Sequence, residues 1–427
     1  MKNWKLLLIF IFSLSSFAGE FNVLTYNVAG LPQIIGKKNG QNGEEKHPLI
    51  SPLLNDYDIV LLQEDFSYHD LLVRSIYHPF FSKQKKSGFF RLGDGLNRLS
   101  QFPFNGLTRE KWSKCFGIFR SSSGNDCLTP KGFSIATHEM APGIFVDIYN
   151  HHGEAGNTIG DSIAIKKNIK QFIEYIKDHS GHRAVILAGD FNLHENDPID
   201  KKHLSNILNS LDLKDTCKEL ECDNYNHIDR IFYRSGHGID LSALEWVNNN
   251  ELFKDKKGNN LSDHPPISVR FNWKKSEVAK RIISLRALNS GLCLGRGQDN
   301  KAVQVDCSNK VQLEVIPTKD YSISLMDVET KTCLDIIRGS KRNKRDLIFG
   351  PCHFKSHQRF FLEDFNYGKL HYLINRHSKK CLDVYKNNKN EGGRIVQFKC
   401  HQDDNQLWDI LENNLYFKKS LSSSHKF

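Results

Sequence analysis

The chain has 427 residues, of which 39% are hydrophobic and 25% are charged. This composition excludes a wholly disordered chain, a collagen-like repeat and a polytopic membrane protein, and the length allows two or three domains. The formal net charge of +10 belongs to residues 275–427, since residues 20–274 carry 30 basic against 32 acidic side chains, which argues against an N-terminal module that strongly attracts DNA.

Residues 1–18 are predicted to be a secretory signal peptide. A basic start, Met1–Lys5, precedes an apolar run that ends near Phe17, and the small residues Ser16 and Ala18 occupy positions −3 and −1 of a cut after Ala18. The alternative, an uncleaved membrane anchor, needs about 20 apolar residues, which is more than this run offers. No later segment is long and apolar enough to span a membrane, so we expect a soluble protein that is secreted.

Residues 19–274 alternate strand-like apolar runs with helical patterns, which is typical of an α/β layered domain. Residues 161–178 carry apolar side chains at helical spacing, and we expect a helix there. Strands are predicted at residues 21–26, 59–62, 144–149, 184–188 and 228–233.

Polar side chains that can bind a metal or move a proton follow many of these runs. They are Asn27, Glu64, His152, Asp190, Asn192, Asp229, Asp263 and His264. Oxygen ligands without thiolates suit Mg²⁺, and histidines beside a metal-held phosphate can activate a water or stabilise charge. Each motif alone is typical of a turn, but their joint occurrence indicates a phosphoester-cleaving site.

In this order the motifs resemble the deoxyribonuclease-I-like endonuclease/exonuclease/phosphatase superfamily, over residues 20–273. The resemblance implies a four-layer α/β/β/α sandwich and Mg²⁺-dependent hydrolysis of phosphoesters. It assigns Glu64 and Asn27 to the metal site, with Asp263 as a further site carboxylate.

The same resemblance implies the catalytic roles. His264 would be the general base, oriented by Asp229. Asp190 and Asn192 would position the nucleophile and the scissile phosphate, and His152 would contact the phosphate.

Two segments resemble secreted bacterial sphingomyelinases: residues 125–133, with Lys-Gly-Phe, and residues 95–103 before them. Leu252 and Phe253, beside lysines, stand where that branch has an apolar hairpin that enters lipid, although its usual tryptophans are missing. The alternative for this segment is an ordinary loop with one buried Phe. We expect a phospholipid substrate, sphingomyelin above all, and peripheral membrane contact; a deoxyribonuclease acting on nucleic acid is the alternative.

Three similar segments begin at Cys293, Cys333 and Cys381, and a second cysteine follows each after 14 or 19 residues. With the glutamines that come after them, these repeats resemble the ricin-type β-trefoil lectin domain over residues 280–417. The resemblance implies an all-β module that binds glycans, in which an Asp accepts hydrogen bonds from sugar hydroxyls and an aromatic ring stacks on the sugar.

The three repeats are unequal in the residues that a sugar site needs. The first has Gly295 in place of Asp, and the second keeps Asp335 but is followed by the basic segment 338–345, which could contact anionic glycans, headgroups or nucleic acid. Trp408 is expected in the core. The predicted carbohydrate-binding residues all lie in the third repeat and are Asp383, Phe398, Asn405 and Gln406.

The even number of cysteines fits an exported protein with short-loop disulfides between sequence neighbours. Zinc sites are the alternative, but the CxxC pairs that zinc sites commonly use are missing. The predicted pairs are Cys115/Cys127, Cys217/Cys222, Cys293/Cys307, Cys333/Cys352 and Cys381/Cys400.

Overall fold

The computed structural model describes most of the chain. The described residues are 18–32, 42–86, 93–117, 126–181, 183–236, 238–276, 280–318, 320, 322–365, 370–401 and 403–412. The predicted signal peptide lies outside them except for Ala18, which opens the first strand. Within these ranges no helix has both the length and the apolar character that crossing a bilayer requires.

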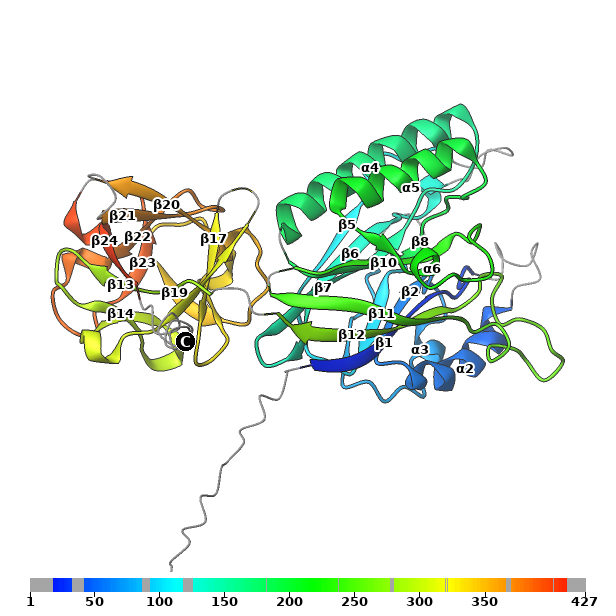
Figure 1. Ribbon diagram of the computed structural model, residues 1–427, viewed down its shortest axis with the longest axis horizontal. Coiled ribbons are helices and arrows are strands. Elements are labelled where there is room, and N and C mark those ends of the chain that lie inside the picture. Colours follow the sequence, from blue (N-terminus) through cyan, green and yellow to red (C-terminus); the bar gives the residue numbers. More distant parts are fainter. Residues whose placement is uncertain are drawn as a thin grey trace, which may run out of the picture.

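Among the described residues, two six-stranded sheets form the centre of the N-terminal module (Figure 1). The first has the order β11 (Ile239–Asn248), β12 (Ile267–Lys275), β1 (Ala18–Asn27), β2 (Ile59–Gln63), β4 (Asn97–Ser100) and β3 (Phe80–Phe81). The second has the order β5 (Phe104–Lys111), β6 (Gly132–Ala141), β7 (Ile144–His152), β8 (Val185–Asp190), β10 (Asp229–Arg234) and β9 (Lys214–Asp215). The strand β2 is an apolar run because both of its faces are buried.

Helices cover the outer face of each sheet. Helices α2 (Gly43–Leu53) and α3 (His69–Leu72) pack on the first sheet, α4 (Ile159–Ser180) and α5 (Pro198–Leu211) pack on the second, and the short α6 (Thr216–Glu219) follows β9. A capping box between Thr158 and Asp161 starts α4. One apolar core lies between the sheets and one under each helical layer, so the predicted four-layer sandwich is confirmed.

The C-terminal module is an all-β trefoil, as predicted, and it surrounds one apolar core. The first repeat holds β13 (Ile282–Ala287), β14 (Cys293–Arg296), β15 (Ala302–Val305) and β16 (Leu313–Pro317). The second holds β17 (Ile323–Asp327), β18 (Cys333–Ile336), β19 (Arg345–Gly350) and β20 (Phe360–Phe365). The third holds β21 (Leu370–Asn375), β22 (Cys381–Val384), β23 (Ile395–Phe398) and β24 (Trp408–Glu412), and β24 pairs with β13 to close the module.

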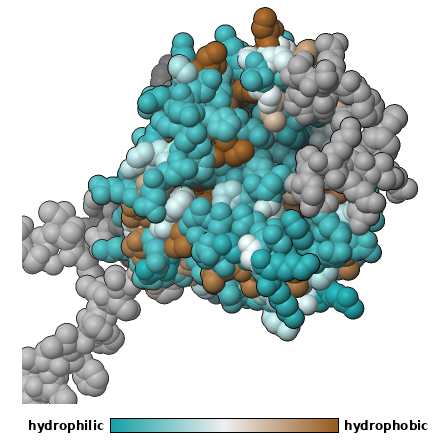
Figure 2. All heavy atoms as spheres, turned by 90° about the vertical axis from the view of Figure 1, so that its right-hand side faces the viewer, coloured by the Kyte–Doolittle hydropathy of each residue, from teal (hydrophilic) through white to brown (hydrophobic). Residues whose placement is uncertain are grey.

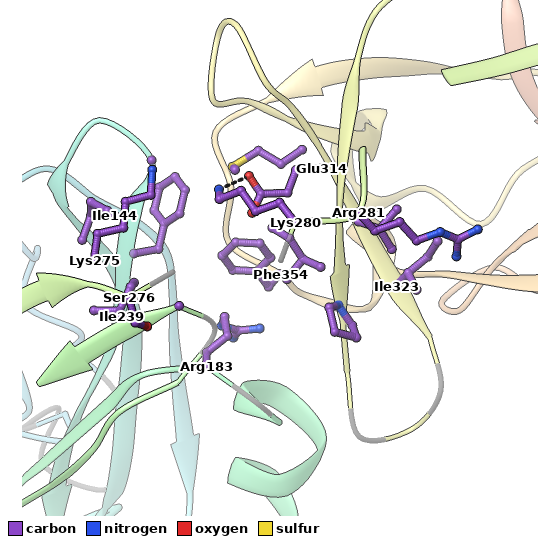
Figure 3. Close-up of a pocket in the computed structure, with 17 residues that line it drawn as sticks. Ile144, Arg183, Ile239, Lys275, Ser276, Lys280, Arg281, Glu314, Ile323 and Phe354 are labelled. Atoms are coloured by element: carbon purple, nitrogen blue, oxygen red, sulfur yellow. Dashed lines mark hydrogen bonds and ion pairs between the residues drawn. The ribbon is translucent and has the colours of Figure 1, made fainter. Parts of the chain in front are cut away.

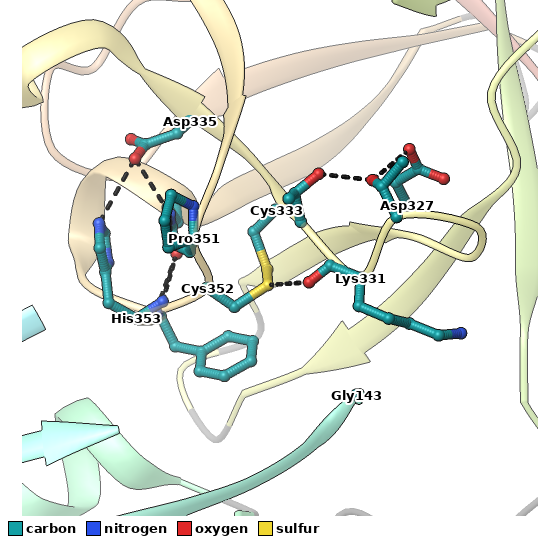
Figure 4. Close-up of a disulfide and its surroundings, with 12 residues drawn as sticks. Gly143, Asp327, Lys331, Cys333, Asp335, Pro351, Cys352 and His353 are labelled. Atoms are coloured by element: carbon teal, nitrogen blue, oxygen red, sulfur yellow. Dashed lines mark hydrogen bonds and ion pairs between the residues drawn. A yellow bond between two sulfur atoms is a disulfide. The ribbon is translucent and has the colours of Figure 1, made fainter. Parts of the chain in front are cut away.

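All ten cysteines lie in the described ranges, and the five predicted disulfides are confirmed. They join Cys115 to Cys127, Cys217 to Cys222, Cys293 to Cys307, Cys333 to Cys352 and Cys381 to Cys400. In every trefoil repeat the bridge ties the second strand to the segment after the third strand; Figure 4 shows the bridge of the second repeat. Closing a loop of about 15 residues restricts the unfolded chain by about 3 kcal/mol in the chain-entropy description.

The bridged cysteines do not share one environment. The first cysteine of each trefoil bridge is buried, but its partner in the first repeat, Cys307, is half-buried, and its partner in the third repeat, Cys400, is exposed. Cys127 is half-buried as well and lies in a short 3-10 turn (Asp126–Leu128). These three cysteines therefore fasten surface segments, and they do not fill a core.

The second trefoil repeat packs directly on the N-terminal module. The buried Arg359 donates hydrogen bonds to the backbone carbonyls of Asp178 and His179, at the C-terminal end of α4. The guanidinium carbon of Arg183 lies 4.4 Å from the ring centroid of Phe354. Because the last carbonyls of a helix have no partner within it, Arg359 caps α4 from the other module.

A cavity of about 330 Å³ lies between the modules (Figure 3). Apolar side chains from both sides line it, among them Ile144 from the N-terminal module and Ile323 from the trefoil, and the ion pair between Lys280 and Glu314 lies along its wall. The two modules therefore meet through apolar contacts, and an ion pair between Arg376 of the trefoil and Asp178 of α4 also joins them.

Candidate active site

Several strands end at the face of the N-terminal module that points away from the trefoil (Figure 1). Asn27 ends β1 and Glu64 follows β2, its parallel neighbour; His152 ends β7 beside Asp190 at the end of β8. The antiparallel β10 begins at Asp229, opposite Asp190. Figure 2 looks onto this face and shows a hollow across its middle. The fold thus gathers side chains that lie far apart in the sequence.

Asn27 links carboxylates from the two sheets. Its Nδ2 donates to Glu64 Oε1 at 3.3 Å and to Asp190 Oδ2 at 3.1 Å, and it lies 3.4 Å from His264 Nε2. Its Oδ1 accepts a hydrogen bond from the N–H of Ala29 at 3.1 Å. The amide is completely buried, so its position is fixed at the centre of the cluster.

Glu64 and Asn192 adopt a left-handed backbone, with φ of 53° and 51°. This conformation costs a non-glycine residue on the order of 1 kcal/mol or more and is concentrated at functional sites. The N–H of Asn192 donates to Asp190 Oδ1 at 2.9 Å, and its Nδ2 donates to the Gly153 carbonyl at 3.1 Å. The turn after β8 thereby fixes Asp190 and Asn192 beside each other in the cluster.

His264 is oriented by a buried carboxylate. Its Nδ1 donates to Asp229 Oδ2 at 2.9 Å, and its Nε2 lies 3.9 Å from Asp190 Oδ2. Burial opposes protonation of His264, but the nearby charges of Asp229 and Asp190 outweigh it and raise the pKa of His264 to about 10. An imidazole held in this way is the usual geometry of an acid/base group.

His152 is completely buried, and its Nε2 lies 3.7 Å from both Glu64 Oε1 and Asp190 Oδ2. Neither of its ring nitrogens has a hydrogen-bond partner. Burial, reinforced by the charges of Lys131 and His264, lowers its pKa well below the ordinary value, so the ring is neutral. Buried polar atoms without a hydrogen-bond partner are rare, and the two ring nitrogens of His152 indicate that a ligand completes the site.

The site gathers negative charge, and its chemistry fits a divalent cation. Burial raises the pKa of both Glu64 and Asp190, and the charge of Asp229 adds to the shift at Asp190. Asp229 Oδ1 is buried without a hydrogen-bond partner, and Asp190, Asp229 and His264 offer ligand atoms within 4.8 Å of one another. A site with oxygen ligands, in which the carboxylates carry more charge than the nearby cationic side chains balance, suits Mg²⁺.

Asp263 does not join this cluster. Its side chain is exposed, and its Oδ1 accepts a hydrogen bond from Ser262 Oγ at 3.3 Å. Residues 261–264 form a bend in which the His264 ring reaches Asp229 while the Asp263 side chain stays exposed.

The predicted lipid-entering tip is only half present. Phe253 is 2% exposed and packs edge-on against Tyr26, with the ring centroids 5.1 Å apart, so for this residue the alternative, a loop with one buried Phe, is confirmed. Leu252 is 64% exposed and remains available.

The structure adds Lys131, to which the sequence motifs gave no role. Its Nζ forms a 2.6 Å ion pair with Asp126 and donates to the Gly153 carbonyl. Burial opposes its charge, but Asp126 and the site carboxylates raise its pKa, so the amine stays positive. Burial and Asp126 also raise the pKa of Glu154 to about 8. Lys131 lies in the Lys-Gly-Phe segment that resembles the sphingomyelinases, and this resemblance was the sequence signal from which a role for Lys131 could have been predicted.

In the third trefoil repeat, the predicted sugar-binding residues come together. Asp383 Oδ2 accepts hydrogen bonds from Asn405 Nδ2 at 3.0 Å and Gln406 Nε2 at 2.7 Å. Gln406 is completely buried and also bonds to the backbone, which is a structural role. Phe398 reaches the group through His401, which the sequence motifs did not single out; their ring centroids are 6.0 Å apart.

Comparison with known proteins agrees with this geometry. The model of the endonuclease/exonuclease/phosphatase family matches residues 24–264, and the model of the ricin-type β-trefoil lectin domain matches residues 281–408. The chain belongs to the endonuclease/exonuclease/phosphatase family, and its C-terminal module is a ricin-type β-trefoil.

Two curated relatives are sphingomyelinases, from Mycobacterium bovis and Mycobacterium tuberculosis. Each is 32% identical over 287 residues, which cover 62% of this chain and 55% of the relative. The chain thus spans about half the length of these relatives. A crystal structure of a mutant beta toxin from Staphylococcus aureus with bound magnesium ions is 16% identical, covers 61% of this chain and 100% of its own, and gives a TM-score of 0.43.

Proposed function

We propose that the protein is a secreted, Mg²⁺-dependent phosphodiesterase that acts as a sphingomyelinase C and is directed to glycans by its trefoil. The observation that carries the proposal is the His264–Asp229 pair beside Asn27, Glu64 and Asp190. The 32% identity to mycobacterial sphingomyelinases supports the lipid substrate.

Each residue of the cluster has a place in such a hydrolysis. A cation held by Glu64 and Asp190 would oppose protonation of His264, whose pKa the nearby aspartates otherwise raise to about 10. His264 Nε2 could then take a proton from the attacking water while Asp229 holds the ring through Nδ1. Asp190 and Asn192 would orient that water and the phosphate, and His152 would contact a phosphate oxygen. Glu64 and Asp190, with Asn27 between them, would hold the cation, which supplies positive charge to the phosphate when bound.

Exposed aliphatic side chains at the start of α4, at the start of α5 and in the segment after β11 fit a lipid substrate. Ile159 begins α4 and is 83% exposed, Ile199 lies in the first turn of α5 and is 60% exposed, and Leu252 is 64% exposed. These helices follow the two site segments that end β7 and β8. Exposed aliphatic side chains with lysines such as Lys256 can enter the headgroup region of a membrane.

A substrate panel tests the proposal. The full chain, supplied with Mg²⁺, is expected to release phosphocholine from sphingomyelin vesicles and to nick plasmid DNA little; chelation should abolish release and added Mg²⁺ should restore it. The measurements are phosphocholine release and conversion of supercoiled plasmid. Efficient nicking without lipid cleavage would favour the alternative, a secreted endonuclease, and full activity in a chelator would contradict the metal assignment.

The trefoil prediction concerns Asp383. Replacing it with alanine should remove most binding to a glycan array, because the carboxylate that would accept sugar hydroxyls is lost. Hydrolysis of a small soluble phosphodiester should stay unchanged, because the catalytic cluster lies in the other module, and circular dichroism of the variant serves as the control for folding of the trefoil. If the arrays stay blank and binding instead follows anionic lipid with steep salt dependence, the exposed basic segment 341–345 targets the protein and the sugar assignment is wrong.

A further inference from the structure

The second trefoil repeat contains a cluster of one carboxylate and two imidazoles, outside the candidate active site. Asp335 lies on β18 and His353 follows Cys352 (Figure 4). His357 lies four residues further along the chain. Asp335 Oδ2 is 3.4 Å from His353 Nε2, and Asp335 Oδ1 is 2.6 Å from His357 Nδ1. The three ligand atoms lie within 4.8 Å of one another.

The third repeat supplies an internal comparison, because its disulfide and strands occupy equivalent places. Asp383 corresponds to Asp335, since each stands two residues after the first cysteine of its repeat, and His401 corresponds to His353. At the position of His357 the third repeat has Asn405, whose amide donates to Asp383. Where the third repeat has the amide of Asn405, the second repeat has the imidazole of His357. This imidazole completes a set of three metal ligands with Asp335 and His353.

The cluster is shielded from solvent yet reachable. The side chains of Asp335, His353 and His357 are 11%, 14% and 21% exposed. Gln358 Nε2 also donates to Asp335 Oδ2 at 3.0 Å, which helps to fix the carboxylate beside the two histidines.

We propose that Asp335, His353 and His357 bind a divalent transition-metal ion, with zinc the best match, at the position where the third repeat would bind a sugar. Two imidazoles and one carboxylate are a common zinc ligand set, with bonds of about 2.0–2.2 Å, and they leave a fourth position for water. Mg²⁺ prefers oxygen ligands, so the two modules would bind different metals.

The position of the cluster indicates what the ion does. His353 and His357 flank Phe354, the ring that packs on Phe145 and Arg183 of the N-terminal module. A metal that joins both histidines to Asp335 fixes the loop that carries this ring. If Nε2 of His353 binds the ion, the ring proton must lie on Nδ1. The 3.2 Å hydrogen bond that Nδ1 now accepts from the N–H of Lys355 would then be given up. The ion would thereby stabilise the contact between the modules.

The test uses the full chain, stripped with a chelator and returned to excess Mg²⁺. Zn²⁺ is titrated by calorimetry and Co²⁺ by visible absorption, and thermal unfolding is followed with and without Zn²⁺. His357→Asn, which installs the residue of the third repeat, is expected to lose one equivalent of tight Zn²⁺, with affinity falling at least about 10- to 100-fold, and to lose the rise in Tm. His401→Asn, at the position of the third repeat that corresponds to His353, should bind like the parent.

A gain-of-binding variant gives an independent measurement. Asn405→His builds the same triad in the third repeat and is expected to add one equivalent of Co²⁺ with a tetrahedral absorption band. The proposal is overturned if His357→Asn binds Zn²⁺ as the parent does, or if Asn405→His adds none. If His357→Asn does not fold, His353→Gln replaces it, and unchanged Zn²⁺ binding by that variant also overturns the proposal.

Discussion

Replacing His264 with alanine is expected to lower kcat on sphingomyelin by about 10²–10⁴-fold, the usual effect of losing a general base. The reason is geometric: Nε2 faces the cluster of Asn27 and Asp190, while Nδ1 is held by Asp229 at 2.9 Å. Alanine removes the proton acceptor and leaves the buried Asp229 carboxylate without its partner. The measurement is initial-rate phosphocholine release at saturating Mg²⁺.

Two variants control this result. His194 lies on the same face but is exposed, and His194→Ala should retain the parent rate. Asp229→Asn keeps the shape but loses the charge that orients His264 and stabilises the imidazolium formed when Nε2 takes the proton, so it should be slower than the parent. The lost charge also lowers the pKa of His264, so the rise of the rate with pH should move to lower pH. A fully active His264→Ala enzyme would show that another group takes the proton.

Replacing Trp408 with alanine is expected to destabilise the trefoil by about 3–5 kcal/mol. The side chain is completely buried in the trefoil core, and its Nε1 donates to the Leu382 carbonyl. Removing the indole leaves a large cavity and an unpaired carbonyl, and the module should be unfolded or close to it at 37 °C. Chemical denaturation followed by circular dichroism measures the loss.

The second repeat supplies the matched control for this variant. Phe360 stands at the position equivalent to Trp408 and is also completely buried in the same core. Trp408→Phe should therefore fold, at a smaller cost than alanine. Equal stability of Trp408→Ala and the parent protein would contradict a core role and return Trp408 to the candidates for sugar contact.

The layered fold could be predicted because its signals are local. The apolar run at residues 59–62 is a strand with both faces covered, and the stripe within residues 161–178 is a helix with one face on the sheet. Neighbouring cysteines pair because the segments that carry them are adjacent within a repeat. Most of the site residues could be proposed because they lie at or near the ends of predicted strands, as Asn27 and Asp190 do, whereas His264 follows none of these strands and was proposed from the family resemblance.

What could not be predicted depends on contacts between distant segments. Nothing local distinguishes Phe253 at an exposed tip from Phe253 against Tyr26, since an aromatic residue in a loop fits both. The ion pair of Lys131 is local in sequence, but its burial against the site carboxylates is not. The cap that Arg359 places on α4 joins residues about 180 positions apart.

Helix α4 separates the candidate active site from the trefoil, the two places where the protein is proposed to bind its ligands. It has 22 residues, begins at Ile159 just after the site segment, and ends where Arg359 caps it, with the trefoil beyond (Figure 1). At 1.5 Å per residue it is about 33 Å long. One small glycolipid therefore cannot fill both proposed sites. The sugar site of the trefoil and the candidate active site would bind two different molecules of the same membrane surface. An enzyme anchored in this way would exhaust the lipid within its reach, and its rate would then follow lateral diffusion of lipid toward the anchor.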